Sequence, residues 1–144
     1  MGFIDRARPR GLYSSFCCVG DLMYSSGVVG RFNGQVIDGV LAGPDDVALG
    51  RQAARAAVAA ILKAADEELS GLNKVAHVVA LTGYLRSVSS FTQHVAVMDA
   101  ASEELNLAFP DTPLPVRTTV GVSSLPSGGA VEVSVVFRLR GETI

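Results

Sequence analysis

Two segments with helical periodicity, placed among segments that alternate like strands, constrain the fold of this chain more than any other feature. The first helix is predicted to begin at Asp45 or Asp46, either of which can cap it, and to run to about Glu68. The second is predicted from about Phe91 to Asn106. Residues expected to face the core form one stripe on each helix: Val47, Ala54, Val58, Ile61, Leu62 and Ala65 on the first, and Val95, Met98, Ala101, Ser102 and Leu105 on the second.

Five strand-like segments surround these helices, at residues 14–19, 22–29, 73–85, 117–122 and 130–139. Gly20-Asp21 suits the tight turn of a first hairpin, and the last two segments are predicted to form another. The Gly-rich segment 30–44 is expected to be a loop with one short strand near Gln35–Ile37. The order β-β-α-β-α-β-β predicts a single domain over residues 1–144. Its fold is expected to be a two-layer α+β sandwich with a mostly antiparallel sheet and both helices on one face.

The composition limits the class of partner. Hydrophobic residues make up 49% of the chain and charged residues only 18%, against about 25% charged in average proteins. We interpret this as surface covered by a partner subunit, the alternative being a hydrophobic monomer. The net charge is −2 without any run of Lys or Arg, so nucleic-acid binding is not expected. Arg6, Arg8 and Arg10 are interpreted as a solvated tail rather than a phosphate-binding group.

Targeting signals and metal-binding patterns are missing from the sequence. The first residues are too polar for a signal peptide, and no apolar stretch approaches the ~20 residues of a membrane span, so a cytoplasmic protein is expected. Cys17 and Cys18 are adjacent in an apolar run and are expected to be core residues, with neither a disulfide framework nor a metal site. His77 is expected to be structural, and His94 to lie on the surface or pack on a helix.

Arg117 and Glu132 form the one pair with an evident chemical use. If the last two strands turn near Ser124-Leu125, the two residues are cross-strand neighbours on the polar face, opposite a face of valines. Such a pair can be a plain surface ion pair, worth ~0–1 kcal/mol. It also suits a small-molecule site, because guanidinium grips a carboxylate at two points while a glutamate moves a proton. Spacing alone leaves both readings open.

Several motifs occur together and in order. They are Pro115-Val116-Arg117-Thr118-Thr119-Val120-Gly121-Val122, then Leu125-Pro126, then Val131-Glu132-Val133, preceded by the hairpin from Val19 to Gly27. With these motifs the chain resembles the YjgF/Rid family, also called endoribonuclease L-PSP, over nearly its whole length. The segment from Ser87 to Leu105 is similar to that of a divergent subgroup of the family.

The resemblance implies a chorismate-mutase-like fold and a homotrimer with sites in the clefts between subunits. It also implies hydrolysis of small enamine or imine acids to 2-oxo acids and ammonia, with no cofactor. In that reaction Arg117 would bind the substrate carboxylate, and Glu132 would position or activate the water.

Further site residues follow from the same resemblance. Tyr13 falls where the family has a tyrosine, and Ser26 and Gly27 would line the pocket. Thr119 stands where active members often carry Cys, and Asp99 would add a negative charge where a neutral amide could face the substrate.

Two other functions stay open at this point. One is a non-catalytic trimer that binds small carboxylates or 2-oxo acids. The other is ribonuclease activity, which the family's second name suggests but which the acidic balance and the lack of an aromatic and basic array disfavour.

Overall fold

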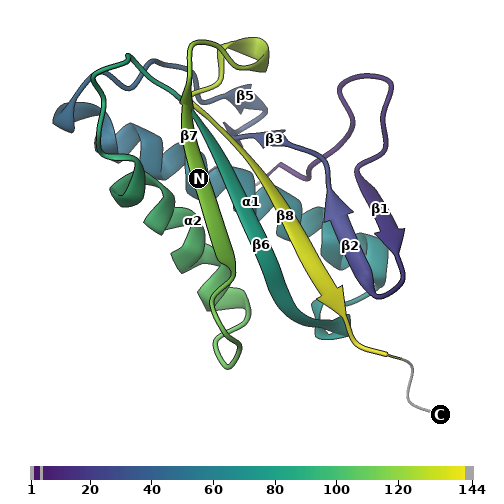
Figure 1. Ribbon diagram of the computed structural model, residues 1–144. Helices are drawn as coiled ribbons and strands as arrows, with labels where there is room; N and C mark the ends of the chain where they lie inside the picture. The colour runs from purple at the N-terminus through teal and green to yellow at the C-terminus, as the bar shows by residue number, and fades with distance from the viewer. Residues whose placement is uncertain (1, 4, 142–144) are drawn as a thin grey trace.

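A sheet with two helices on one face makes up the computed structural model, which describes residues 2–3 and 5–141 (Figure 1). The helices are α1, Val47–Leu69, and α2, His94–Ala108, and three short 3-10 turns are η1 Pro44–Asp46, η2 Leu72–Lys74 and η3 Pro126–Gly128. The strands are β1 Phe16–Val19, β2 Leu22–Ser25, β3 Val28–Val29, β4 Arg31–Phe32, β5 Gln35–Val36, β6 Val75–Arg86, β7 Val116–Val122 and β8 Val131–Leu139. The predicted two-layer α+β sandwich is confirmed.

The main sheet has the strand order β1-β2-β8-β6-β7, and β3 also pairs with β8. β7 runs parallel to β6, whereas the other pairs are antiparallel. The predicted hairpin between the last two strands is therefore wrong, because β6 lies between them. Alternation and turn residues correctly predict that the two strands exist. They do not predict that β7 pairs with one edge of β6 and β8 with the other.

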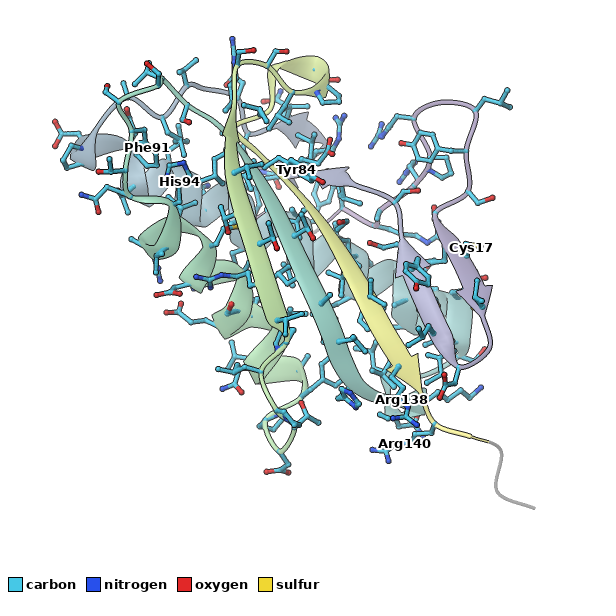
Figure 2. All side chains as sticks on the ribbon, in the orientation of Figure 1. Cys17, Tyr84, Phe91, His94, Arg138 and Arg140 are labelled. Carbon is cyan, nitrogen blue, oxygen red and sulfur yellow. The ribbon has the colours of Figure 1, made fainter. Side chains whose placement is uncertain are left out.

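The first hairpin forms as predicted. Gly20 has φ 60° at the turn, and Val19 pairs with Leu22. Cys17 and Cys18 are exposed rather than buried, so their expected place in the core is wrong (Figure 2). They lie on β1, which is the edge strand of the sheet.

Segment 30–44 carries a second, small hairpin. β4 pairs with β5 across Asn33 and Gly34, which have φ of 53° and 78°. Asn-Gly in this conformation is a preferred two-residue hairpin turn. A Cβ on Gly30 would lie 2.2 Å from the backbone oxygen of Ala53, so glycine allows this part of the chain to pass directly against α1.

Helix α2 packs through a stripe that differs in part from the predicted one. Met98, Ala101 and Leu105 are buried as expected. Val97 is also buried, whereas Val95 is 66% exposed, so the prediction for Val95 is wrong. Val95 is one position past the start of the helix and lies away from the stripe that Val97 and Met98 begin.

Helix α1 begins at Val47, directly after Asp46, which is one of the two residues predicted to cap it. Asp46 occupies its N-cap position, but the carboxylate accepts a hydrogen bond from the Ala42 backbone nitrogen at 2.7 Å. Neither helix of the described chain is long and apolar enough to cross a membrane.

Candidate functional site

Arg117 and Glu132 lie on opposite faces of the sheet. Arg117 pairs with Leu81 on β6, and Leu81 is buried beneath the helices. Glu132 pairs with Tyr84, three positions further along the same strand, on the face that the helices leave open. Side chains alternate between faces along a strand, and directly paired residues share a face. The prediction that Arg117 and Glu132 are cross-strand neighbours is therefore wrong.

Arg117 is held by helix α2. One terminal nitrogen of its guanidinium donates to Asp99 Oδ1 at 2.9 Å and to Ser102 Oγ at 2.8 Å. The Arg117 side chain is mostly buried, whereas that of Asp99 is half exposed. Thr119 pairs with Gly83 and lies on the same helix-covered face. Arg117, Asp99 and Thr119 thus form one group at the edge strand of the sheet.

Glu132 has a different environment. Its carboxylate makes neither a hydrogen bond nor an ion pair with any of the described residues, and burial raises its pKa above the usual range. Arg117 of the same chain does not lower this pKa, because it lies on the other face of the sheet. A Cβ on Gly27 would lie 2.5 Å from Glu132 Oε2, so the glycine makes room for the carboxylate.

Glu132, Gly27 and Tyr13 line one cavity of about 100 Å³. The Tyr13 hydroxyl accepts a hydrogen bond from the Arg10 backbone nitrogen at 3.0 Å, which ties the tyrosine to the N-terminal segment. Ser26 lines a smaller adjoining cavity of about 10 Å³, and its hydroxyl donates to the Ser14 carbonyl at 2.6 Å. These residues form a second group, on β8, at the start of β3 and in the N-terminal segment.

Comparison with known proteins decides the family. A model of the family described as Endoribonuclease L-PSP matches residues 3–138. The chain belongs to this family, which is also known as YjgF or Rid.

Individual similar proteins align over most of their length. "Protein TCP17" from Trypanosoma cruzi is 32% identical over 136 residues, which is 93% of this chain and 85% of that protein. The solved structure of Atu1372 from Agrobacterium tumefaciens, a protein described as of unknown function, has a TM-score of 0.84 at 30% identity, covering 90% of this chain and 82% of the other. RidA from an Antarctic Psychrobacter has a TM-score of 0.64 at 25% identity, covering 94% of each chain.

In this L-PSP family member the cavity beside Glu132 is also lined by arginines that the sequence analysis did not place there. They are Arg6, which pairs with Glu67 of α1, and Arg8, Arg10 and Arg31. The interpretation of Arg6, Arg8 and Arg10 as a solvated tail is therefore incomplete, because all three contribute to a cavity wall. Arg31 was not singled out at all. Its only sequence signal is its place before Asn33-Gly34, which predicts a hairpin and hence a fixed position.

The remaining candidates of the L-PSP chain have structural surroundings. His94 begins α2, and its ring meets Phe91 edge-on, with 5.3 Å between the ring centres, as expected for a helix-packing histidine (Figure 2). Within the described part of the chain, no group of three His, Cys, Asp or Glu side chains could hold a metal ion.

Proposed function

We propose that this member of the L-PSP family is a cofactor-free hydrolase of small 2-imino acids, and that its site is shared by two copies of the chain. The observation that supports the proposal best is the isolated carboxylate of Glu132. It is half-buried, its pKa is raised by burial, and it lines a small cavity beside Gly27 and Tyr13. A carboxylate with a raised pKa is a stronger base, which suits proton transfer near neutral pH.

The reaction balances without a cofactor. Ionised Glu132 takes a proton from water while the water oxygen bonds to the imine carbon, and the C=N electron pair moves to nitrogen. The carboxyl group then returns the proton to that nitrogen. The C–N bond then breaks as the new hydroxyl gives its proton to Glu132, which passes it to the leaving nitrogen, so that ammonia and a 2-oxo acid are released. Arg117 would hold the substrate carboxylate through its planar fork.

Two copies are needed because Arg117 and Glu132 lie on opposite faces of one sheet. Arg117 lies on β7, an edge strand, where a neighbouring copy can reach it. The open face of the sheet carries Tyr24, Val116 and Val120 as exposed apolar residues. Apolar surface gathered on one face is typical of an interface. We therefore propose a homotrimer in which Arg117 of one copy faces Glu132 and Tyr13 of the next.

The substitution Glu132→Gln tests the proposal, with Glu103→Gln as a matched control. Glu103 lies on α2, where it is bound by Arg51 and Arg55 rather than lining the cavity. With freshly generated 2-iminobutanoate, we expect Glu132→Gln to lower kcat about 10²-fold or more while affinity for 2-oxobutanoate stays within about tenfold. Glu103→Gln should keep wild-type turnover. Equal turnover in the wild type and the Glu132→Gln variant would rule out Glu132 as the base.

One observation favours a second candidate, a non-catalytic binder of small carboxylates. Asp99 already occupies the guanidinium of Arg117, so a substrate carboxylate has to compete with it. If the wild-type protein binds 2-oxobutanoate but does not accelerate hydrolysis of the imine, the binder is the correct function and Glu132 has no catalytic role.

A further inference from the structure

Three of the four arginines that line the cavity beside Glu132 have no ion-pair partner within the described part of the chain, whereas the fourth, Arg6, pairs with Glu67. The side chains of Arg8, Arg10 and Arg31 form no hydrogen bond or salt bridge with any of the described residues. Asp5 is the one other acidic residue that lines this cavity, and its Oδ2 accepts a hydrogen bond from the Gly34 backbone nitrogen at 3.0 Å. The wall therefore carries more positive than negative charge, with unused hydrogen-bond donors.

Arg31 is the best-placed of the three arginines. It is partly buried, whereas Arg8 and Arg10 are exposed. Burial lowers the pKa of the Arg31 guanidinium, and the positive charge of Arg10 lowers it further, while Asp5 and Tyr13 act in the opposite direction. An anion bound beside Arg31 and Arg10 could accept hydrogen bonds from both guanidinium groups and reduce the repulsion between them.

The backbone around these arginines is well anchored. The Ala7 nitrogen donates to the Ala60 carbonyl of α1 at 3.1 Å, which fixes the segment that carries Arg8. Arg31 pairs with Val36 in the small hairpin, directly after Gly30, which passes against α1. A cluster held by a helix on one side and a hairpin on the other differs from a freely solvated tail.

We propose that this cavity binds a second anionic group, carboxylate or phosphate, on the far end of the substrate whose reacting carbon lies beside Glu132. The inference rests on the proposed function and narrows it to substrates with two anionic ends. The volume of about 100 Å³ is small, against roughly 300–1,000 Å³ for sites that hold drug-sized ligands. The far end is therefore a single compact group.

A purely apolar substrate chain fits this cavity poorly. It would displace water from Arg31 and leave its guanidinium without a partner, which is unfavourable. A carboxylate or phosphate accepts the same donors in a two-point grip. The cavity is thus expected to select for charge at the far end rather than for chain length.

The test compares ligands of similar length that differ at the far end. By calorimetry at low salt, the wild-type protein is expected to bind 2-oxoglutarate about tenfold or more tightly than 2-oxohexanoate, whose far end is an uncharged alkyl group. A third ligand, 2-oxo-4-phosphonobutanoate, shows whether carboxylate or phosphate is preferred. The preference for the charged ligands should shrink as salt is added.

Arg31→Gln should reduce the preference for the charged ligands to about twofold and leave the affinity for 2-oxohexanoate nearly unchanged. Arg138→Gln is the matched control, since Arg138 pairs with Asp21 and lies at the opposite end of β8 (Figure 2). It should keep the wild-type preference. If Arg31→Gln does not fold, as judged by its thermal melt, Arg10→Gln has the same expected outcome.

The inference is overturned if the wild type binds the charged and uncharged ligands equally, if none binds below millimolar concentration, or if Arg31→Gln weakens all of them alike. These results are separate from those on the reaction, because binding is measured without turnover. If the protein prefers 2-oxoglutarate but hydrolyses no imine, the site for a second anionic group is supported and the proposed hydrolase function is wrong. If the protein hydrolyses 2-iminobutanoate but shows no preference for a second charge, the hydrolase function stands and the site for a second anionic group is wrong.

Discussion

Two glutamates of this chain have opposite electrostatic environments. Burial raises the pKa of Glu132, whereas hydrogen bonds from Arg55 and Arg51 lower the pKa of Glu103 on α2. A raised pKa means that the folded chain binds protons more tightly than the unfolded chain at this position, and a lowered pKa means the reverse. The two residues therefore contribute to stability in opposite directions as the pH changes.

For Glu132 the contribution to stability is complete below the ordinary glutamate pKa of 4.5 and is lost as the pH rises through the raised folded value. The Glu132→Gln variant has no carboxyl group at this position to lose a proton, so its stability does not fall for this reason as the pH rises. We expect its free energy of unfolding, relative to the wild type, to be higher at pH 8 than at pH 4.5, as measured in urea at one protein concentration. Glu103→Gln should show the opposite trend, since the contribution of Glu103 is lost as the pH falls. Parallel stability curves for Glu132→Gln and the wild type would contradict the prediction.

Asp99 limits the access of a ligand to Arg117. Asp99→Asn removes the competing charge but keeps the size of the side chain, so affinity for 2-oxobutanoate should rise about three- to tenfold. Asp21→Asn is the control, because Asp21 pairs with Arg138 in an exposed ion pair far from Arg117. Calorimetry measures both variants. Unchanged affinity in Asp99→Asn would show that Arg117 is not the group that binds the carboxylate.

At the scale of the elements, the sequence predicts strands better than their partners. Alternation correctly indicates that Val131, Val133 and Val135 share a buried face. The same alternation predicts Val120 on that face of valines, which is wrong, because Val120 lies in β7, on the open face, together with Tyr84 of β6. Alternation is a local property of one strand, whereas the choice of neighbour depends on tertiary packing. The residue types of the site were thus predictable from motifs, but the faces were not.

The arginines that line the cavity are a second example of an arrangement that local sequence patterns do not predict. Arg8 and Arg10 come together with Arg31 only because an N-terminal segment, a small hairpin and α1 meet in space. The spacing of residues in the sequence does not predict that these three segments lie close together. The small hairpin itself is predictable from Asn33-Gly34, because this pair is a preferred two-residue hairpin turn.

The close approach of the β3–β4 segment to α1 gives a prediction at this scale. In Gly30→Ala the new methyl group would meet the Ala53 backbone oxygen, which cannot rotate away. We expect a loss of about 1–3 kcal/mol in the free energy of unfolding, measured in urea. Gly43→Ala is the matched control, because nothing lies within 4 Å of its added Cβ and its φ of −173° is open to any residue. Equal stability of the two variants would mean that the β3–β4 segment can shift away from α1 at no cost in stability.

At the scale of the whole molecule, the sheet has one covered face and one open face (Figure 1). Val116 lies on the open face and is 72% exposed. If this face is the trimer interface, Val116→Glu places an unpaired carboxylate in it and should dissociate the assembly. Leu107→Glu is the control, since Leu107 is 77% exposed but belongs to the helix layer. Light scattering should return three times the chain mass for the wild type and the control, and a single chain mass for Val116→Glu. A wild type that scatters as a monomer at micromolar concentration would remove the shared site.

The position of β6 between β7 and β8 also has a genetic consequence. Since Arg117 and Glu132 face opposite ways, the proposed site shared between copies would allow two damaged subunits to complement each other. Arg117→Ala and Glu132→Gln subunits should each be inactive alone. When they are unfolded together in equal amounts and reassembled at random, roughly a quarter of the clefts regain both intact residues. Two defective alleles of this gene in one cell would then restore part of the activity that neither provides by itself.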